Sequence, residues 1–381
     1  MFIAHKIELR PTEQQEQFLR QTAGARRFVW NQCLAEWNWA YEHGFKPDKD
    51  YIVFYFNVLR HRNPWLKDVS MNTIRNTVFD LVDTWNRFFK GIGKRPRFKK
   101  RGFKDSFSIR QSEKFCISGR RVGIEKLERK KPVIRMRQKL RFSGEPKQAA
   151  FSCRAGKWFV SVLVKLVANP FTNKMPADES QAVGLDLGVK DLAVLSDGTV
   201  FPAVRPLKKA MRRLKRLQKQ LSRKIKGSNR YKRMKRRIAR LHYFISCKRK
   251  AILHELTDYL TRNFKVICIE DLNVSGMLKN HRLAGAIADC GFYEFRRQLE
   301  YKARFRGCIV SVIDRFAPTS KTCSRCGQIH DMPLSKRVMR CDCGFIICRD
   351  KNAAINILKL GLDRIEPDLK RTLESSGCIT C

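Results

Sequence analysis

The chain has 381 residues, of which 80 are Lys or Arg and 35 are Asp or Glu, so its formal net charge is +45 at pH 7. This length exceeds what one hydrophobic core usually organises, and we expect two to four substructures. So large a charge repels itself unless a polyanion neutralises it, while 43% hydrophobic residues exclude a disordered basic tail. No apolar run approaches the roughly 20 residues of a membrane-spanning helix. The composition therefore favours a nucleic acid over a membrane as the partner.

The N-terminal sequence and the cysteines favour a cytoplasmic protein. Residues 1–8 become charged too early to supply the apolar stretch of a secretory signal. Four of the 14 Cys form two closely spaced pairs, and the others are scattered through apolar segments such as 266–269. In a reducing compartment the scattered thiols are most simply small core residues.

The first half of the chain predicts a strand, a helical region and a small β domain, in that order. Residues 2–9 alternate apolar and polar, and Thr12 then begins a helix with Gln15 placed for a capping box. Helical patterns continue to about residue 90. Residues 91–104 are rich in Gly, Pro, Lys and Arg, the composition of a connector or of a loop that faces phosphate. Short β-branched runs at 105–168 predict strands, and 169–180 resemble a linker.

The segment from Arg205 to Lys250 holds 21 Lys or Arg and no Asp or Glu. Apolar residues at helical spacing on both sides of residues 227–229 predict a basic helical hairpin; they are Met211, Leu214, Leu217, Leu221, Ile225, Met234, Ile238 and Leu241. A run of charge is often only a solvated face, but exposed helices usually mix both signs. The missing acids favour contact with phosphates.

Three carboxylates stand at the ends of apolar segments. Asp186 closes the run 182–186, Glu270 closes 266–270, and Asp350 opens a helical pattern at 349–358. Phosphodiester hydrolysis can use two divalent cations about 3.5–4 Å apart, and Mg²⁺ prefers carboxylate oxygens. Taken singly, the acids could be a turn start, a solvated strand end and a helix-start acid. Their order, strand-Asp, strand-Glu, helix-Asp, is that of a ribonuclease-H-like fold and favours catalysis.

Two cysteine pairs predict a zinc site. Cys323 and Cys326 form a Cys-x-x-Cys-Gly sequence, and Cys341 and Cys343 form Cys-x-Cys-Gly after 14 intervening residues. Four thiolates form a natural tetrahedral cage for one Zn²⁺, and a site closed by four protein ligands is structural because it leaves no position for water. Four unrelated core thiols would not be expected in such pairs, each followed by Gly.

These motifs together resemble the TnpB family of transposon-encoded proteins. Residues 184–190 are similar to the first RuvC motif of that family, 269–273 to the second and 349–358 to the third. Residues 6–13 and 94–99 are similar to its opening strand and to its junction between helix and loop. The resemblance thus covers nearly the whole chain, and three motifs in order are more specific than any one of them.

The resemblance implies a mixed α/β multidomain fold with a catalytic metal site. Its expected parts are a β-barrel wedge domain (1–10 and 101–180), an inserted helical recognition domain (11–100), a RuvC-like, RNase H-like nuclease domain (181–315 and 346–365) with a basic helical insertion at about 205–262, a zinc ribbon (316–345) and a C-terminal tail (366–381). It implies that Asp186, Glu270 and Asp350 are catalytic and hold two Mg²⁺.

The resemblance also implies an RNA-guided DNA endonuclease of the prokaryotic cytosol, near the nucleoid. A noncoding guide RNA from the transposon end would pair with target double-stranded DNA next to a short motif. One alternative is a nuclease-impaired, RNA-guided regulator of the same fold. A DNA-transposing enzyme would need a paired-His and Tyr nucleophile constellation, which is not evident, and an RNA-packaging protein would leave the ordered acids unexplained.

Two features depart from the family pattern. The second cysteine pair is Cys-x-Cys where the family usually has Cys-x-x-Cys, which would either weaken the zinc site or recruit Cys348. The residues before Arg349 and Asp350 are Ile347 and Cys348, where family members commonly carry His and Asp. Because groups behind the ligands orient them, this second departure lowers the expectation of full activity.

Overall fold

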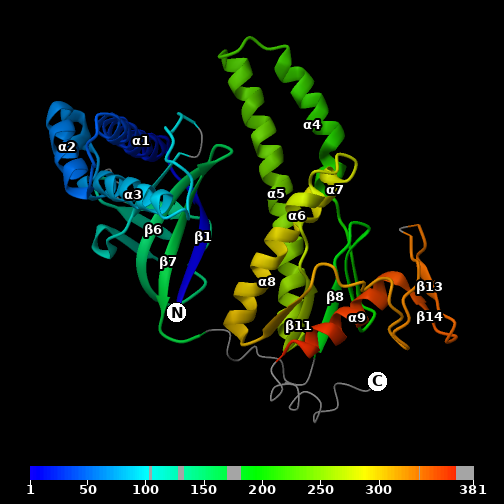
Figure 1. The fold of residues 1–381 in the computed structure, drawn as a ribbon. Coiled ribbons are helices and arrows are strands. Elements are labelled where there is room, and N and C mark those ends of the chain that lie inside the picture. Colours follow the sequence, from blue (N-terminus) through cyan, green and yellow to red (C-terminus); the bar gives the residue numbers. More distant parts are fainter. Residues whose placement is uncertain (103–104, 128–132, 170–181, 334, 366–381) are drawn as a thin grey trace. The chain divides into compact units, whose positions relative to one another are not determined.

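The computed structural model describes residues 1–102, 105–127, 133–169, 182–333 and 335–365 (Figure 1). The chain divides into two compact units, Met1–Asn169 and Pro170–Cys381. The expected linker after Asn169 and the expected C-terminal tail lie outside the described residues. None of the described helices is both long and apolar enough to cross a membrane.

The first unit contains a seven-stranded antiparallel sheet that curves into a half-barrel (Figure 1). The strand order is β2-β6-β7-β1-β5-β4-β3, so the N-terminal strand lies in the middle of the sheet. The alternation predicted for this strand is confirmed, since His5, Ile7 and Leu9 are buried and their neighbours are less so. The strands are β1 (Phe2–Arg10), β2 (Ser106–Ile109), β3 (Phe115–Ser118), β4 (Arg121–Ile124), β5 (Val133–Met136), β6 (Gly144–Arg154) and β7 (Lys157–Leu166).

Three long helices complete the first unit: α1 (Glu13–Glu42), α2 (Lys49–Arg62) and α3 (Met71–Phe89). The predicted capping box is present at the start of α1, where the backbone N–H of Gln15 donates to Thr12 Oγ1 and that of Thr12 donates to Gln15 Oε1. The helices share a separate apolar core, in which the rings of Trp37 and Trp85 stack 5.5 Å apart. The helical region ends at Phe89, as its sequence pattern predicts.

The second unit is built on a five-stranded mixed sheet of order β10-β9-β8-β11-β12. Strands β8 (Ala182–Asp186), β11 (Val266–Glu270) and β12 (Ile309–Ile313) are parallel, whereas β9 (Asp191–Leu195) and β10 (Val200–Pro202) are antiparallel additions. Helices cover both faces. Ile267 and Ile269 belong to the core that contains residues of α5 (Asn229–Asn263) and α8 (Phe292–Arg306), while Cys268 belongs to the core of α9 (Arg349–Asp363).

The predicted basic hairpin is confirmed by α4 (Pro206–Ser222) and α5, which lie side by side (Figure 1). Its turn contains Gly227, at φ +90°, and the α5 N-cap Ser228. The structure places Met211 and Ile225 at the surface, 38% and 83% exposed, so these two do not join the core between the helices. That core contains Leu214, Leu217, Met234, Leu241 and Ile245.

The smaller elements lie around this framework. Asp289 in α7 (Ala284–Cys290) anchors the hairpin, because its carboxylate accepts hydrogen bonds from the first turn of α4 and from Arg249 of α5. Helix α6 (Val274–Met277) precedes α7, and the two-stranded sheet of β13 (Val338–Arg340) and β14 (Ile346–Cys348) precedes α9.

Candidate active site and metal centre

Asp186 and Glu270 end neighbouring parallel strands, and Asp350 lies in the first turn of α9. In the ladder between β8 and β11, Leu185 pairs with Ile269. The next residue on each strand is an acid, so Asp186 and Glu270 end adjacent strands at the same edge of the sheet. The structure thus places the three acids at two strand ends and one helix start, as the sequence predicts.

Two glycines let α9 lie directly on the sheet. A Cβ atom at Gly184 of β8 would be 2.1 Å from the carbonyl oxygen of Ala354, and one at Gly361 of α9 would be 2.4 Å from the sulfur of Cys268. Any larger residue would push the helix away. Because Ala354 is one turn after Asp350, this close packing fixes the start of α9 relative to β8.

Asp186 is affected electrostatically by the other two acids. Burial raises the pKa of Asp186 to about 7, with further contributions from the negative charges of Glu270 and Asp350 and an opposing one from Arg349. Burial also raises the pKa of Glu270, and a hydrogen bond from Thr319 opposes it. Crowded carboxylates with raised pKa values are favourable ligands for a divalent cation, which would relieve their repulsion.

The carboxylates form an open arrangement. Among the described residues, only four cysteines bring candidate ligand atoms all within 4.8 Å of one another. A guanidinium nitrogen of Arg337 lies 4.0 Å from Asp350. Asp271, the residue after β11, is held between Arg296 and Arg315, so it is already neutralised by two cations. Hence Glu270 is the more available of these two acids to a cation.

Sequence reasoning missed Thr319, which supports Glu270. Its hydroxyl donates a hydrogen bond of 2.6 Å to Glu270 Oε1, and the side chain is buried. The carbonyl oxygen of Thr319 in turn accepts a 2.8 Å hydrogen bond from the side chain of Asn356 in α9. A lone Thr in a loop carries no sequence signal for this role.

Two buried asparagines of α9 hold the first cysteine pair against the helix. The amide of Asn352 donates to the carbonyl of Thr322 at 2.7 Å, and its oxygen accepts from the N–H of Ser324 at 2.9 Å. Asn356, one turn later, donates to the same Thr322 carbonyl at 2.7 Å. Buried Asn at positions i and i+4 of an apolar helical segment was the available sequence signal. The helix that carries Asp350 is thus hydrogen-bonded to the cysteine-bearing loop.

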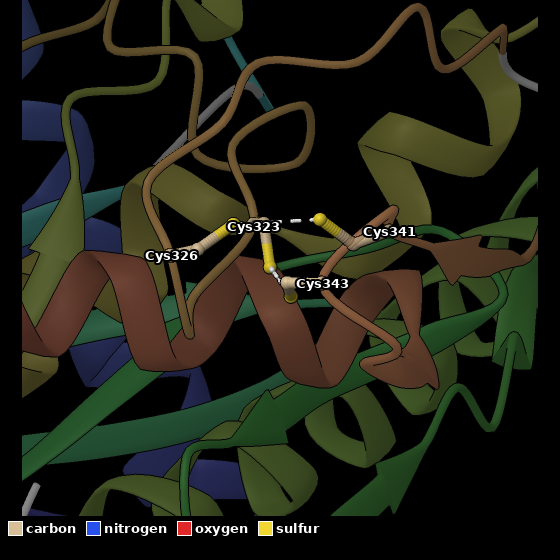
Figure 2. Close-up of side chains that lie close together, drawn as sticks. All are labelled: Cys323, Cys326, Cys341 and Cys343. Carbon is tan, nitrogen blue, oxygen red and sulfur yellow. Dashed lines mark hydrogen bonds between the residues drawn. The ribbon is translucent and has the colours of Figure 1, made fainter.

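The four predicted cysteines form one cluster (Figure 2). The sulfurs of Cys323 and Cys343 are 3.9 Å apart, and those of Cys326 and Cys341 are 3.4 Å apart. Zn–S bonds of about 2.3 Å in a tetrahedral site separate sulfurs by about 3.8 Å. The donor set and its spacing therefore fit one Zn²⁺. Cys348 is exposed and is not part of the cluster.

The shortened second pair reaches the cluster because its turn closes one residue earlier. In the first pair the N–H of Gly327 donates to the carbonyl of Cys323, four residues back, and in the second the N–H of Gly344 donates to that of Cys341, three residues back. Both hydrogen bonds are 2.9 Å long, and both glycines have φ +80°. A ring nitrogen of His330 also lies 3.1 Å from the Cys341 sulfur.

Three family models match the chain. The OrfB model of IS605-type elements, described as "Probable transposase", matches residues 161–281. A Cas12f1-like TNB domain matches 292–357, which contains the cysteine cluster, and an OrfB helix-turn-helix domain matches 1–46.

Full-length relatives agree with these matches. The "Putative RNA-guided DNA endonuclease InsQ" of Escherichia coli (strain K12) is 37% identical over 380 residues, covering 94% of this chain and 92% of the relative. A protein of Streptomyces pristinaespiralis named "Putative RNA-guided DNA endonuclease" is 34% identical over 366 residues, covering 94% and 89%. The fold resembles a chain in the Cas12f1-sgRNA-target DNA complex, with a TM-score of 0.56 at 15% identity over 90% of this chain and 82% of that one. The chain therefore belongs to the TnpB family, the OrfB proteins of IS605-type transposable elements.

Proposed function

We propose that this protein is a metal-dependent, RNA-guided DNA endonuclease in which Asp186, Glu270 and Asp350 bind the catalytic cations. The observation that carries the proposal is the grouping of these three acids at one edge of the mixed sheet, where burial and then the charges of Glu270 and Asp350 raise the pKa of Asp186. Raised pKa values in a group of acids indicate a site that is completed by a cation.

Nucleic-acid partners follow from charge and from the relatives. A net charge of +45 needs a polyanion, and the α4–α5 hairpin presents basic residues without a single acid between Arg205 and Lys250. The curated relatives from E. coli and Streptomyces are named as RNA-guided DNA endonucleases. We therefore propose a noncoding guide RNA and target double-stranded DNA as the partners.

The residues have distinct parts in the proposed hydrolysis. Two Mg²⁺ held by the acids would supply an activated water and neutralise the leaving oxygen of the cleaved phosphodiester. Asp186 and Glu270 are fixed by the ladder between β8 and β11, and Asp350 is fixed by the packing of α9 on Gly184. Thr319 orients Glu270 through its hydrogen bond.

The same proposal assigns a role to each part of the chain. Residues 1–10 and 101–180, whose described strands form the half-barrel, would be the wedge domain, and the helices within 11–100 would recognise nucleic acid. The mixed sheet of 181–315 and 346–365 would be the RuvC-like, RNase H-like nuclease domain. The 316–345 segment would be a zinc ribbon, in which one Zn²⁺ on the four cysteines is structural because it leaves no open position.

A cleavage assay with matched controls tests the proposal. Asp186→Ala, Glu270→Ala and Asp350→Ala should each abolish cleavage of guide-matched DNA with Mg²⁺ and leave guided DNA binding nearly intact, because they remove a metal ligand but no phosphate contact. Asp197→Ala removes an acid from the turn between β9 and β10 and should cleave normally. A variant among the three that still cleaves is not a ligand.

Guided binding without cleavage is the second candidate. Ile347 and Cys348 stand where the family resemblance leads us to expect His and Asp before Arg349 and Asp350. Groups next to metal ligands tune affinity, so this difference favours a weakened nuclease. Wild-type protein that binds guide-matched DNA tightly and leaves it intact in Mg²⁺ and in Mn²⁺ would establish this alternative.

A further inference from the structure

One pocket of the first unit lies outside the carboxylate site and the cysteine cluster. It has a volume of about 670 Å³ and lies between α1, residues 97–100 and the start of β2. Its lining includes a single acid, Asp105, and five basic residues: Arg26, Arg27, Arg97, Lys99 and Lys100. Residues 97–100 belong to the segment 91–104, whose composition is that of a connector or of a loop that faces phosphate.

The segment 97–99 is held in place although it forms neither helix nor strand. The indole N–H of Trp30 in α1 donates to the carbonyl of Arg97 at 3.0 Å. The side chain of Asn31 accepts from the N–H of Lys99 at 2.8 Å and donates to its carbonyl at 3.1 Å. Three hydrogen bonds from one turn of α1 thus fix the backbone, and the pocket is preformed.

The basic residues of the pocket are only partly neutralised. Arg27 pairs with Asp105 at 2.9 Å, and Arg26 shares Asp80 with Arg110 outside the pocket. No described carboxylate lies within 4.0 Å of the remaining three cations, which are Arg97, Lys99 and Lys100. The pocket therefore has an excess of positive charge that an anion would balance.

Lys99 is the most enclosed of these three cations. Its Nζ lies 3.3 Å from the centre of the buried Trp30 ring. Burial, and then the charge of Arg26, lower the pKa of its ammonium to about 7. The negative charge of Asp80 opposes this shift only in part, and a phosphate in the pocket would add further counter-charge. Phe98, between Arg97 and Lys99, is 56% exposed and offers a ring to a base.

We propose that this pocket binds a phosphodiester group of a nucleic-acid strand, with Arg97, Lys99 and Lys100 as its cationic contacts and Phe98 stacked on a neighbouring base. The proposal deepens the nucleic-acid function proposed above and rests on it. The strand is either RNA or DNA, and the chemistry of the pocket is the same for both, so the experiment has to separate them.

The test compares two charge-removing variants of the full chain. Lys99→Met keeps the aliphatic stem over Trp30, and Lys139→Met removes an exposed Lys that does not line the pocket. Binding of a labelled RNA oligonucleotide and of a DNA oligonucleotide of the same sequence is measured over a range of salt concentrations. Lys99→Met should flatten the log–log salt slope by about 0.7–0.9 for the strand that the pocket holds. Lys139→Met should leave that slope unchanged.

Thermal denaturation of each variant shows whether it is folded. If Lys99→Met does not fold, Lys100→Gln provides the same measurement, because its side chain is exposed. Ultraviolet cross-linking gives a second readout, because a strand stacked on Phe98 should cross-link to the peptide that contains it. The proposal that the pocket binds a strand would be overturned if two results were found together. These are salt slopes for Lys99→Met and Lys100→Gln equal to that of Lys139→Met, and no cross-link to the peptide that contains Phe98. A wild-type protein that binds neither strand would instead overturn the proposed function.

Discussion

The two candidate metal sites of the second unit are built in opposite ways. The cysteine cluster uses two short turns, and its four sulfurs lie within 4.8 Å of one another. The acids come from two strands and a helix far apart in the sequence, and burial, followed by the charges of Glu270 and Asp350, raises the pKa of Asp186. Cys323 and Cys341 pack with the apolar side chains of Met332 and Met339, whereas the acids repel one another and a bound cation would relieve that repulsion.

The contacts between the two sites indicate which of them depends on the other. The cysteine turns are local in the sequence, and the loop that carries the first pair also contacts the acid site. Asn352 and Asn356 bind the cysteine-bearing loop to α9, and Thr319 in that loop donates to Glu270. We therefore expect damage to the cysteine cluster to reach the acids, and damage to the acids to leave the cysteine cluster intact.

Removing a cysteine should have the largest effect. The purified protein should carry one Zn²⁺ per chain, and Cys326→Ser should lose it and unfold the ribbon, because structural zinc contributes about 10–16 kcal/mol of apparent binding free energy to small domains. Metal analysis and thermal denaturation measure both effects. Cys348→Ser is the control and should keep its zinc. Zinc that falls with Cys348→Ser and persists with Cys341→Ser would show that the ligand set is wrong.

Neutralising Asp186 should have the next largest effect, which is a change in how the stability of the protein depends on pH. In metal-free protein the folded chain keeps this proton to about pH 7, whereas an unfolded chain loses it near its ordinary pKa of 3.8. At this residue the folded state binds more protons in that window, so the contribution of Asp186 to stability falls as pH rises from about 4 to about 7. The difference between the two pKa values corresponds to about 4 kcal/mol. Asp186→Asn should remove this loss and make the metal-free protein more stable at pH 8.

Urea unfolding at pH 4 and pH 8, with and without Mg²⁺, measures this effect. Mg²⁺ should stabilise the wild type at pH 8 and have little effect on Asp186→Asn. Asp197→Asn, in the turn between β9 and β10, should behave as the wild type does. A stability difference between Asp186→Asn and the wild type that stays the same from pH 4 to pH 8 without metal would contradict the raised pKa.

The link between the two sites should have a smaller effect. Asn352→Ala leaves the buried N–H of Ser324 without its acceptor, which costs about 1–3 kcal/mol, and leaves Asn356 as the remaining side-chain donor to the carbonyl of Thr322. It should also release zinc faster to a chelator. Asn352→Asp keeps an acceptor for Ser324 and should lie between the alanine variant and the wild type. Equal rates of zinc release to the chelator in all three proteins would show that the hydrogen bonds of Asn352 do not stabilise the zinc site.

The sequence predicted the positions of the three acids at strand ends and at a helix start better than it predicted the residues that surround them. Asp186 and Glu270 were found because an acid after an apolar run is conspicuous in so basic a chain, and the order of the acids suggested the fold. The capping box and the basic hairpin follow from local spacing, and both are present. Local patterns cannot give the strand order, which depends on long-range pairing, nor the approach of α9 permitted by Gly184 and Gly361.

Helical spacing alone also failed to separate core from surface in the basic hairpin. Met211 and Ile225 match the apolar repeat, yet α4 ends at Ser222, so Ile225 lies in the turn and is exposed. The end of α4 decides whether Ile225 meets the partner helix, and it cannot be read from apolar spacing; Met211 lies within α4 but is exposed. Thr319 was missed because its role arises from a single tertiary hydrogen bond.

The smallest effect should come from Thr319, the last residue on the path from the cysteines to the acids. Thr319→Val removes the hydroxyl that donates to Glu270 at 2.6 Å, so the pKa of Glu270 should rise further and its hold on a cation should weaken. Loss of such a supporting hydrogen bond typically lowers metal affinity by about 10–100-fold. Titration calorimetry with Mn²⁺ measures this affinity directly, independently of cleavage.

Thr319→Ser keeps the hydroxyl and should restore the affinity, whereas both variants should carry one Zn²⁺ because the carbonyl that Asn356 contacts is unchanged. This separates orientation of Glu270 from loss of the ribbon, since damage to the ribbon would lower zinc content in both. If Thr319→Val bound Mn²⁺ as tightly as the wild type, the hydrogen bond would not position Glu270. The cysteine loop would then support the acid site only through its asparagine contacts with α9.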